Sequence, residues 1–308
     1  MRIVVIGPGA LGTLLAVSLT RDTSHEIWLM DHNQHRAEEL GQNGLILEKG
    51  TEKFHYPIKV TTKAREIRPA DLILLCVKSQ DVAEGLQSIS SALHDKSLLI
   101  SFQNGISHLN ILQENTLPCQ TAIGVTSLGA NLVKPGHVKY GGYGLTKIGF
   151  AQPGNLADQT LEIAASLFNS SGLDTIVVSD IINHVWSKLL INVGINALTA
   201  IHDCPNGQLL ELPKAREHLR GAVKEAAAVA RALEIKIDHD PIVRCMEVCR
   251  ATEQNISSML QDVRRKRPTE IDAINGAIIE TASRLGIPAP INRELVGKIK
   301  RIEQKYLV

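Results

Sequence analysis

Residues 3–20 read IVVIGPGALGTLLAVSLT and carry no charged side chain, so this stretch limits the fold more than any other. Hydropathy alone would fit a signal peptide, with Ala16-Val17-Ser18 imitating a cleavage site, or a marginal membrane span. The first apolar run stops, however, at Gly7-Pro8-Gly9, and a second, helix-like run follows. A signal peptide is a continuous apolar helix. The interruption therefore predicts a strand, a turn and a helix, and neither export nor membrane insertion is expected.

The turn has the spacing G-x-G-x-x-G, in the residues Gly7, Pro8, Gly9, Ala10, Leu11 and Gly12. In this motif the first glycine permits a tight turn, the second lets a pyrophosphate approach the backbone, and the third allows the helix to pack closely on the strand. Free N–H groups at the helix start favour the phosphate charge. A second predicted strand, 26–30, ends at Asp31, 19 residues after Gly12. A dinucleotide-binding domain places the acid that meets the adenosine ribose at this distance.

Three later runs are short and continuously apolar, like strands buried on both faces of a parallel sheet, and they span 71–77, 98–102 and 121–125. Ligand-binding residues are expected just beyond the carboxyl ends of such strands. Lys78 follows the first of these runs, and Gln103-Asn104-Gly105 follows the second. These polar residues are therefore candidates for a binding site.

The β-like pattern ends before residue 180. Residues 137–149 predict a hairpin, because Gly141-Gly142 separates two short β-like pieces, and 175–178 would be the last strand. From about residue 180 onward the pattern is helical. We predict an α/β chain with an N-terminal Rossmann-type dinucleotide-binding domain, residues 1–179, and an all-α C-terminal domain, residues 180–308, that binds substrate and carries the catalytic group.

A strongly apolar predicted helix, 182–201, carries Lys188, Asn192 and Asn196 on one stripe, four residues apart. Lysines on helices are usually solvated. Here the other side chains make a poor surface for solvent, so the stripe is predicted to line a polar cleft. Partial burial lowers the pKa of a lysine toward the range of a useful general acid. His184, one turn earlier, is interpreted as a structural histidine.

The composition restricts the partners of the chain. Its 308 residues include 33 Lys and Arg against 32 Asp and Glu, so no excess of charge attracts nucleic acid. The basic run 264–267 has no interleaved aromatic residue and is interpreted as a solvated turn. The five cysteines are scattered and form no CxxC pair, which argues against a disulfide framework and a zinc site. We expect no metal and a reducing, cytoplasmic location.

A second polar constellation covers 255–262 and 268–276, and part of it has a structural explanation, because Thr269 after Pro268 can cap a helix. Together with the preceding motifs it resembles the ketopantoate reductase (2-dehydropantoate 2-reductase) family. The resemblance runs from the glycine turn to the helix near Lys300. It is carried by Gly7-x-Gly9-x-x-Gly12, Lys78, Asn104-Gly105, Trp186-x-Lys188-Leu189-x-x-Asn192-x-x-x-Asn196, Cys204-Pro205-Asn206-Gly207, Asn255-x-Ser257-Ser258-Met259-Leu260-Gln261-Asp262 and Thr269-Glu270-Ile271-Asp272-x-Ile274-Asn275-Gly276.

The resemblance implies that NADPH reduces the C2 ketone of ketopantoate to (R)-pantoate, a precursor of pantothenate and coenzyme A. It assigns the proton donor to Lys188 and the contact with the terminal hydroxyl of the substrate to Glu270. The polar ends of the substrate would be bound by Asn104, Asn192, Asn196, Asn255 and Ser258. The cofactor would be bound by residues 7–12, Asp31, Lys78 and Asn104.

One position departs from the family pattern. Where the family usually presents an arginine for the 2′-phosphate of NADP, this chain reads Met30-Asp31-His32-Asn33. Asp31 resembles the acid that accepts a hydrogen bond from a free ribose 2′-hydroxyl, and it would repel a phosphate there. His32, Arg36 and Lys78 are candidates for compensating charge. NADP(H) therefore follows from the family and NAD(H) from Asp31, and both stay open.

Two alternative functions also stay open. A reductase of the same architecture acting on another 2-oxo acid would keep Lys188 and Glu270 but have a different pocket. A non-catalytic dinucleotide sensor would need the glycines but neither the proton donor nor the hydroxyl clamp. A homodimer is left open as an assembly.

Overall fold

The computed structural model describes residues 1–21, 24–151, 159–237 and 239–307. The chain divides into two compact units, the first made of residues 1–103 and 109–181 and the second of residues 104–108 and 182–308. This division differs from the predicted boundary at residue 180 chiefly in the segment Asn104–His108. That segment packs with the helical unit, although the strand before it belongs to the sheet.

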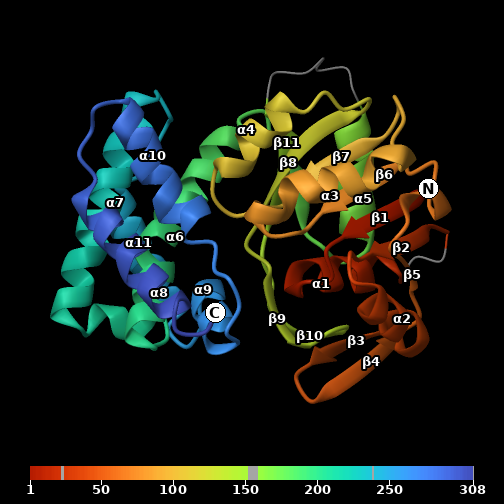
Figure 1. Ribbon diagram of the computed structural model, residues 1–308, viewed down its shortest axis with the longest axis horizontal. Helices are drawn as coiled ribbons and strands as arrows, with labels where there is room; N and C mark the ends of the chain where they lie inside the picture. The colour runs from red at the N-terminus through yellow and green to blue at the C-terminus, as the bar shows by residue number, and fades with distance from the viewer. Residues whose placement is uncertain (22–23, 152–158, 238, 308) are drawn as a thin grey trace. The chain divides into compact units, whose positions relative to one another are not determined.

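The first unit is built on an eight-stranded sheet with the order β12-β11-β8-β7-β6-β1-β2-β5 (Figure 1). Its strands are β1 (Arg2–Ile6), β2 (Glu26–Met30), β5 (Lys59–Thr61), β6 (Leu72–Leu75), β7 (Leu98–Ser101), β8 (Gln120–Thr126), β11 (Thr146–Phe150) and β12 (Thr175–Val177). All neighbours are parallel except β8 and β11. Strands β1, β6 and β7 are buried almost completely, which explains their continuous apolar sequences.

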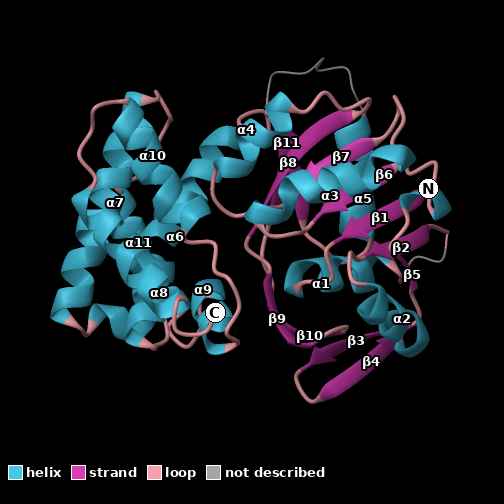
Figure 2. Cartoon of the chain, viewed as in Figure 1, coloured by secondary structure: helices cyan, strands magenta, loops and turns pink. Residues whose placement is uncertain are grey.

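Helices flank this sheet, as Figure 2 shows for α1, α2, α3 and α5. They span α1 (Ala10–Leu19), α2 (Gln34–Asn43), α3 (Val82–Ile89) and α5 (Thr160–Ser170), with α4 (Ser107–Glu114) following β7 and short 3-10 helices at Ala64–Glu66, Ser79–Asp81 and Ser90–Ala92. The buried face of α1 packs with residues of β1 and β2 in one apolar core. This packing fixes the start of α1 beside the carboxyl end of β1.

A second, four-stranded sheet has the order β4-β3-β10-β9, formed by β3 (Leu45–Lys49), β4 (Glu52–Tyr56), β9 (Gly129–Lys134) and β10 (His137–Gly142). The predicted hairpin over 137–149 is therefore wrong. Strand β10 pairs with β9 and β3, whereas β11 pairs with β8 in the larger sheet. At Gly142 the backbone has a φ of +126°, where glycine is favoured, and the chain leaves one sheet for the other. Two β-like runs around a Gly-Gly do not by themselves fix which strands they pair with.

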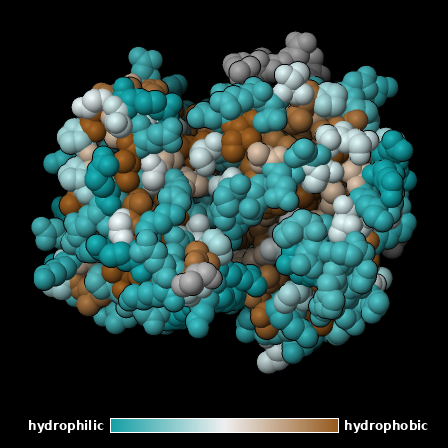
Figure 3. Space-filling view, viewed as in Figure 1, coloured by the Kyte–Doolittle hydropathy of each residue, from teal (hydrophilic) through white to brown (hydrophobic). Residues whose placement is uncertain are grey.

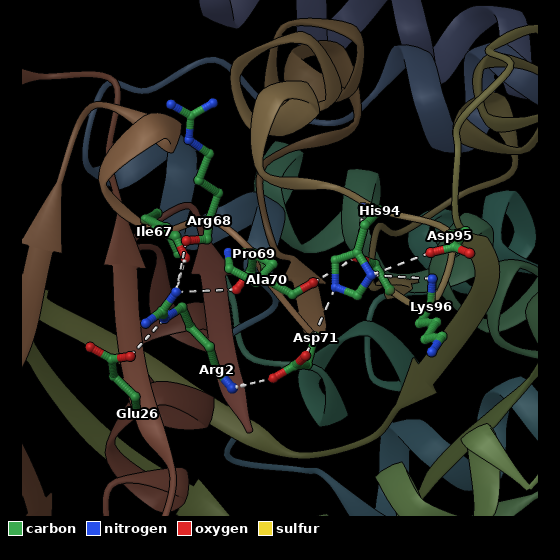
Figure 4. A network of polar contacts seen from close by, with 11 residues as sticks. Arg2, Glu26, Ile67, Arg68, Pro69, Ala70, Asp71, His94, Asp95 and Lys96 are labelled. Atoms are coloured by element: carbon green, nitrogen blue, oxygen red, sulfur yellow. Dashed lines mark hydrogen bonds and ion pairs between the residues drawn. The ribbon is translucent and has the colours of Figure 1, made fainter.

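The amino ends of the central strands are tied together by Arg2 (Figure 4). Its Nε donates to Glu26 Oε2 at 2.6 Å, and its backbone N–H donates to Asp71 Oδ2 at 2.6 Å. One guanidinium nitrogen donates to the carbonyls of Ile67 and Arg68 at 3.0 and 2.8 Å. This network closes the edge of the sheet opposite the carboxyl ends, where the glycine turn lies.

The second unit is helical, with α6 (Ile181–His202), α7 (Pro213–Ala232), α8 (Pro241–Ala251), α9 (Ser258–Arg264), α10 (Ala277–Arg284) and α11 (Pro290–Glu303), a 3-10 helix at Gly207–Leu210 and a π-helical turn at Asp272–Gly276. Side chains of α6, α7, α8, α10 and α11 form one apolar core. Inside it, Asn275 Nδ2 donates to Asn292 Oδ1 at 3.0 Å and to the carbonyl of Val193 at 3.2 Å. These bonds tie the π-helical turn to α6 and α11.

Hydrophilic residues cover most of the face drawn in Figure 3. Within the described residues, no helix combines the length and the hydrophobicity that a membrane span requires.

Candidate functional site

The glycine turn is held by very close backbone contacts. Gly7 has a φ of +95°, and its N–H donates to the carbonyl of Met30 at 3.1 Å. A Cβ at Gly7 would lie 2.9 Å from the backbone nitrogen of Val77, and one at Gly12 would lie 2.1 Å from the Gly7 carbonyl oxygen. Only glycine fits at these two positions, for reasons of conformation and packing within the protein.

Gly9 differs from Gly7 and Gly12, because a side chain at this position would clash with no neighbouring atom. A Cβ there would meet no atom within 4 Å, and the φ of −74° is accessible to any residue. Gly9 precedes the first turn of α1 and has no side chain with which to cap its N–H groups. Internal packing gives no reason for a glycine here, whereas the approach of a ligand to the backbone does. The turn therefore fits the pyrophosphate of a dinucleotide.

Beyond β6 and β7, two residues shape the carboxyl edge of the sheet. Gln103 is buried, and its Nε2 donates to the carbonyls of Leu75 and Val77 at 2.9 and 3.0 Å. It holds the end of β7 against the loop that follows β6. Lys78 is half-buried in that loop, and its carbonyl accepts the N–H of Asp81 at 2.9 Å. The loop thus places a cation at the edge where the glycine turn lies.

At the end of β2 the structure gives Asp31 a partner. Its carboxylate, which has no solvent-exposed area, accepts from Nε and Nη2 of Arg36, each at 2.5 Å. The backbone N–H of Asn33 donates to the same carboxylate at 3.1 Å. Asp31 is thus enclosed in an ion pair.

In the second unit, Lys188 lies on α6, directly before two buried leucines. Leu189 and Leu190 are 1% and 3% exposed, and Lys188 itself is half-buried. Burial lowers the pKa of Lys188 to about 8, while the negative charge of Glu270 acts in the opposite direction. A lysine that titrates near neutral pH is suited to give a proton to a developing oxyanion.

Asn104 reaches the same part of the second unit. Its Nδ2 donates to Glu270 Oε2 at 2.9 Å. The following residue, Gly105, has a φ of +81°, and a Cβ there would lie 2.0 Å from the carbonyl oxygen of Ala273. Glycine at 105 therefore allows this segment to press against the turn that carries Glu270. The structure brings together three of the predicted site residues, Asn104, Lys188 and Glu270.

Residues of α11 hold the turn that carries Glu270 in place. Buried Glu303 accepts the backbone N–H of Thr269 at 2.7 Å through Oε1, and Lys300 forms an ion pair with Asp272. The hydroxyl of Thr269 accepts the N–H of Ile271 at 3.3 Å, and the turn continues as a π-helix rather than as a regular capped α-helix. The Thr269 motif thus shapes the turn that presents Glu270.

The other predicted substrate residues lie in two places. Asn192 is half-buried and Asn196 is 6% exposed, one and two turns beyond Lys188 on α6. Asn255 and Ser258 are exposed, at the turn before α9 and in its first position. The neighbouring Ser257, which is buried, caps α9 by accepting the N–H of Leu260 at 3.1 Å.

The run 204–207 holds the turn before α9. The backbone N–H of Asn206 donates to the carbonyl of Asn255 at 3.0 Å, and that of Gly207 donates to the carbonyl of Glu253 at 3.1 Å. A Cβ at Gly207 would lie 2.4 Å from Cγ of Glu253. These residues therefore support the backbone of the turn that carries Asn255.

His108, the second residue of α4, was not predicted from the sequence to be part of the site. It is fully buried, and among the described residues neither ring nitrogen has a hydrogen-bond partner. Burial lowers its pKa to about 4, and the positive charge of Lys188 acts in the same direction. The imidazole is therefore neutral at physiological pH. A single histidine beyond the Asn104-Gly105 motif gives no signal of burial in the sequence.

Two protein-family models match most of this chain. Residues 3–153 match the model described as ketopantoate reductase PanE/ApbA, and residues 180–303 match its C-terminal model. The chain belongs to the ketopantoate reductase family. The resemblance that the motifs indicated is thereby confirmed over both halves of the sequence.

Two curated relatives in this family are 2-dehydropantoate 2-reductases. The protein from Halobacterium salinarum is 32% identical over 302 residues, covering 97% of this chain and 98% of the relative. The protein from Pyrococcus horikoshii is 33% identical over 303 residues and covers 98% of both chains.

Solved structures share the fold. A PanE/ApbA family ketopantoate reductase from Ralstonia eutropha JMP134 superposes with a TM-score of 0.90 at 28% identity, covering 100% of both chains. A D-mandelate dehydrogenase, solved with NADH and anilino(oxo)acetate, has a TM-score of 0.91 at 25% identity and covers 100% of both chains. The predicted fold class, a Rossmann-type α/β unit followed by a helical one, is confirmed.

Proposed function

We propose that the chain is a 2-dehydropantoate 2-reductase, which reduces ketopantoate to (R)-pantoate with a nicotinamide dinucleotide and serves pantothenate biosynthesis. The observation that carries the proposal is the cluster in the second unit, where Lys188 has a lowered pKa and Asn104 donates to Glu270 at 2.9 Å. Membership of the ketopantoate reductase family and the names of the relatives support the substrate.

When bound, the nicotinamide supplies the hydride that reduces the ketone. Residues 7–12 would bind the pyrophosphate through the backbone N–H groups of the turn, and Lys78 would add a positive charge at the same edge of the sheet. The Lys188 ammonium stabilises the alkoxide that develops on the substrate and then gives it a proton. Burial assists this transfer, because it lowers the free-energy cost of removing the proton from the lysine.

Glu270 would bind the terminal hydroxyl of ketopantoate. A carboxylate offers about four acceptor positions, and the bond from Asn104 uses one of them while fixing the orientation of the group. Asn192, Asn196, Asn255 and Ser258 stay proposals for the other polar ends of the substrate. Amide and hydroxyl groups suit this role because they orient a ligand without competing for the transferred proton.

The test is an absorbance assay of NADPH and NADH oxidation with ketopantoate. We expect turnover with ketopantoate, and we expect that Lys188→Ala abolishes it while leaving the Kd of the reduced cofactor unchanged. A purified, folded chain that binds cofactor but turns over no 2-oxo acid would favour the dinucleotide sensor.

A second candidate substrate class is supported by the structural similarity to D-mandelate dehydrogenase, at 25% identity over the full chain. That protein was solved with NADH and an anilino-substituted oxoacetate. The same assay with benzoylformate, the 2-oxo acid that corresponds to mandelate, separates the two. A kcat/KM for benzoylformate above that for ketopantoate would replace the proposed substrate. The cytoplasmic location and a homodimer are carried forward as predictions.

A further inference from the structure

The residues after β2 form a closed set of hydrogen bonds within the first unit. Asn33 Oδ1 accepts the backbone N–H of Arg36 at 2.9 Å and so caps α2. The Asn33 N–H donates to Asp31 Oδ1 at 3.1 Å, and the Arg36 side chain returns to Asp31 with two bonds of 2.5 Å. Arg36 is therefore fixed at three points, by the helix, by its cap and by Asp31.

The two partners of this ion pair differ in what they offer to a ligand. The Asp31 side chain is 0% exposed and the Arg36 side chain is 32% exposed. Both oxygens of Asp31 accept from Arg36. A guanidinium has five N–H donors, and two of them are used on Asp31, so others can reach a ligand. At the carboxyl end of β2 the accessible group is thus cationic, and the carboxylate is neutralised beneath it.

The carboxyl end of the second strand is where a Rossmann-type domain meets the adenosine ribose. An exposed aspartate there would accept the 2′- and 3′-hydroxyls of NAD(H) and repel a 2′-phosphate. A guanidinium held there instead attracts a phosphate, for which its planar set of donors is well suited. His32, whose side chain is 74% exposed, lies beside the pair, with its Nδ1 3.7 Å from Asp31 Oδ1.

We propose that Arg36 determines the choice of cofactor by binding the 2′-phosphate of NADP(H), and that Asp31 is the positioning residue that holds it there. This inference deepens the proposed function and rests on it only for the use of a nicotinamide dinucleotide. The charge of Asp31 does not exclude NADP(H), because Arg36 already neutralises it. Asp31 stands at the position of the acid that binds the ribose in NAD(H)-specific proteins, but here it holds the side chain of Arg36 in place.

The experiment measures the binding of two probes to the full chain by calorimetry, adenosine 2′,5′-bisphosphate and adenosine 5′-monophosphate. Neither probe contains nicotinamide, so the result does not depend on which 2-oxo acid is reduced. We expect the wild-type chain to bind the bisphosphate at least tenfold more tightly than the monophosphate. Arg36→Gln should weaken bisphosphate binding by about tenfold to a hundredfold, the range for lost charge-assisted bonds, and change monophosphate binding by less than about threefold.

Two further variants separate positioning from direct contact. Asp31→Asn keeps the guanidinium and should change monophosphate binding by less than about threefold, since the buried carboxylate is not a ribose ligand in this account. Arg36→Lys keeps the charge but loses the paired donors, so it should fall between the wild type and Arg36→Gln. Arg220→Gln, at an exposed arginine of α7, is the matched control and should move neither Kd by more than about threefold. Urea unfolding confirms that each variant is folded.

Two results would overturn the proposal. Equal or tighter binding of the monophosphate by the wild type, together with a tenfold loss in Asp31→Asn, would make Asp31 the ribose ligand and the chain NAD(H)-specific. Unchanged bisphosphate binding in folded Arg36→Lys and Arg36→Gln would remove Arg36 from the site. Absence of reductase activity with the expected probe pattern intact would contradict only the proposed function.

Discussion

The two candidate sites of this molecule are built in different ways. In the first unit the glycine turn offers backbone N–H groups, and six consecutive residues supply it. In the second unit the Lys188 cluster offers side chains, and its members come from positions 104, 188 and 270. Substitutions that add atoms should therefore weaken ligand binding at the glycine turn. Substitutions that remove a charge should weaken the function of the Lys188 cluster. This difference sets what each kind of mutation should do.

The largest effect is expected from Lys188→Ala, which removes the proposed acid. Loss of a general acid typically costs about 10²- to 10⁴-fold, so kcat/KM for ketopantoate should fall by about a thousandfold. The Kd of the reduced cofactor, followed by its fluorescence, should stay within about twofold, because the glycine turn is untouched. Lys224→Ala, at an exposed lysine of α7, is the matched control and should retain full activity. Equal losses in both variants would contradict the assignment.

The second-largest effects are expected from substitutions of Gly12 and Gly9, two glycines of the same turn. Gly12→Ala places a methyl group 2.1 Å from a carbonyl oxygen, so it should destabilise the fold by about 1–3 kcal/mol and weaken cofactor binding strongly. Gly9→Ala places its methyl group in open space and should leave the unfolding free energy within about 0.5 kcal/mol. Its cofactor Kd should nevertheless rise about tenfold or more, because the methyl group occupies space that the pyrophosphate needs. Urea unfolding and calorimetry measure the two effects. A Gly9→Ala variant with unchanged cofactor affinity would rule out that position as the phosphate cradle.

A smaller effect is expected from Glu270→Gln. Loss of a charge-assisted bond to the substrate hydroxyl should raise KM for ketopantoate by about tenfold. The same change removes the negative charge that raises the pKa of Lys188, so the alkaline limb of the pH profile should move to lower pH. Glu280→Gln, at an exposed glutamate of α10, is the control for loss of charge and should leave KM unchanged. A normal KM in Glu270→Gln would remove Glu270 from the substrate site.

The smallest effect concerns His108, whose buried ring nitrogens have no partner among the described residues. Replacing both nitrogens by an apolar side chain removes an uncompensated desolvation cost. His108→Leu should therefore raise the unfolding free energy by about 1 kcal/mol, measured by urea denaturation. A marked loss of stability would show that the nitrogens are hydrogen-bonded in solution.

Local features of the fold were predictable where the physical constraint is local. The glycine turn, strand 26–30 and the buried runs of the central sheet follow from steric needs and from burial on both faces. The four-stranded sheet was not predicted, because its two local pairs, β3 with β4 and β9 with β10, are joined only by the parallel pairing of β3 with β10, which lie far apart in the sequence. Alternation alone does not identify partners in such a sheet.

The candidate sites, too, were only partly predictable from the sequence. Lys188 stood out because a cation interrupts a strongly apolar helix, yet the effect of the Glu270 charge on its pKa depends on the tertiary fold. The enclosure of Asp31 by Arg36 was also beyond the sequence, since a residue five positions away on a helix start can point toward the acid or away from it. Spacing in the sequence identified the candidate residues, but only the tertiary structure shows which of them interact with one another.

The pH dependence of kcat/KM for ketopantoate tests the central claim most directly, because the claim is that Lys188 donates the proton. The group must be protonated to act, and its pKa is about 8, so activity should be fully present below this pH and lost as the pH rises through it. We predict one ionisation near pH 8 that moves to lower pH in Glu270→Gln. A profile that stays flat through pH 9.5, or one that Glu270→Gln leaves in place, would contradict the account.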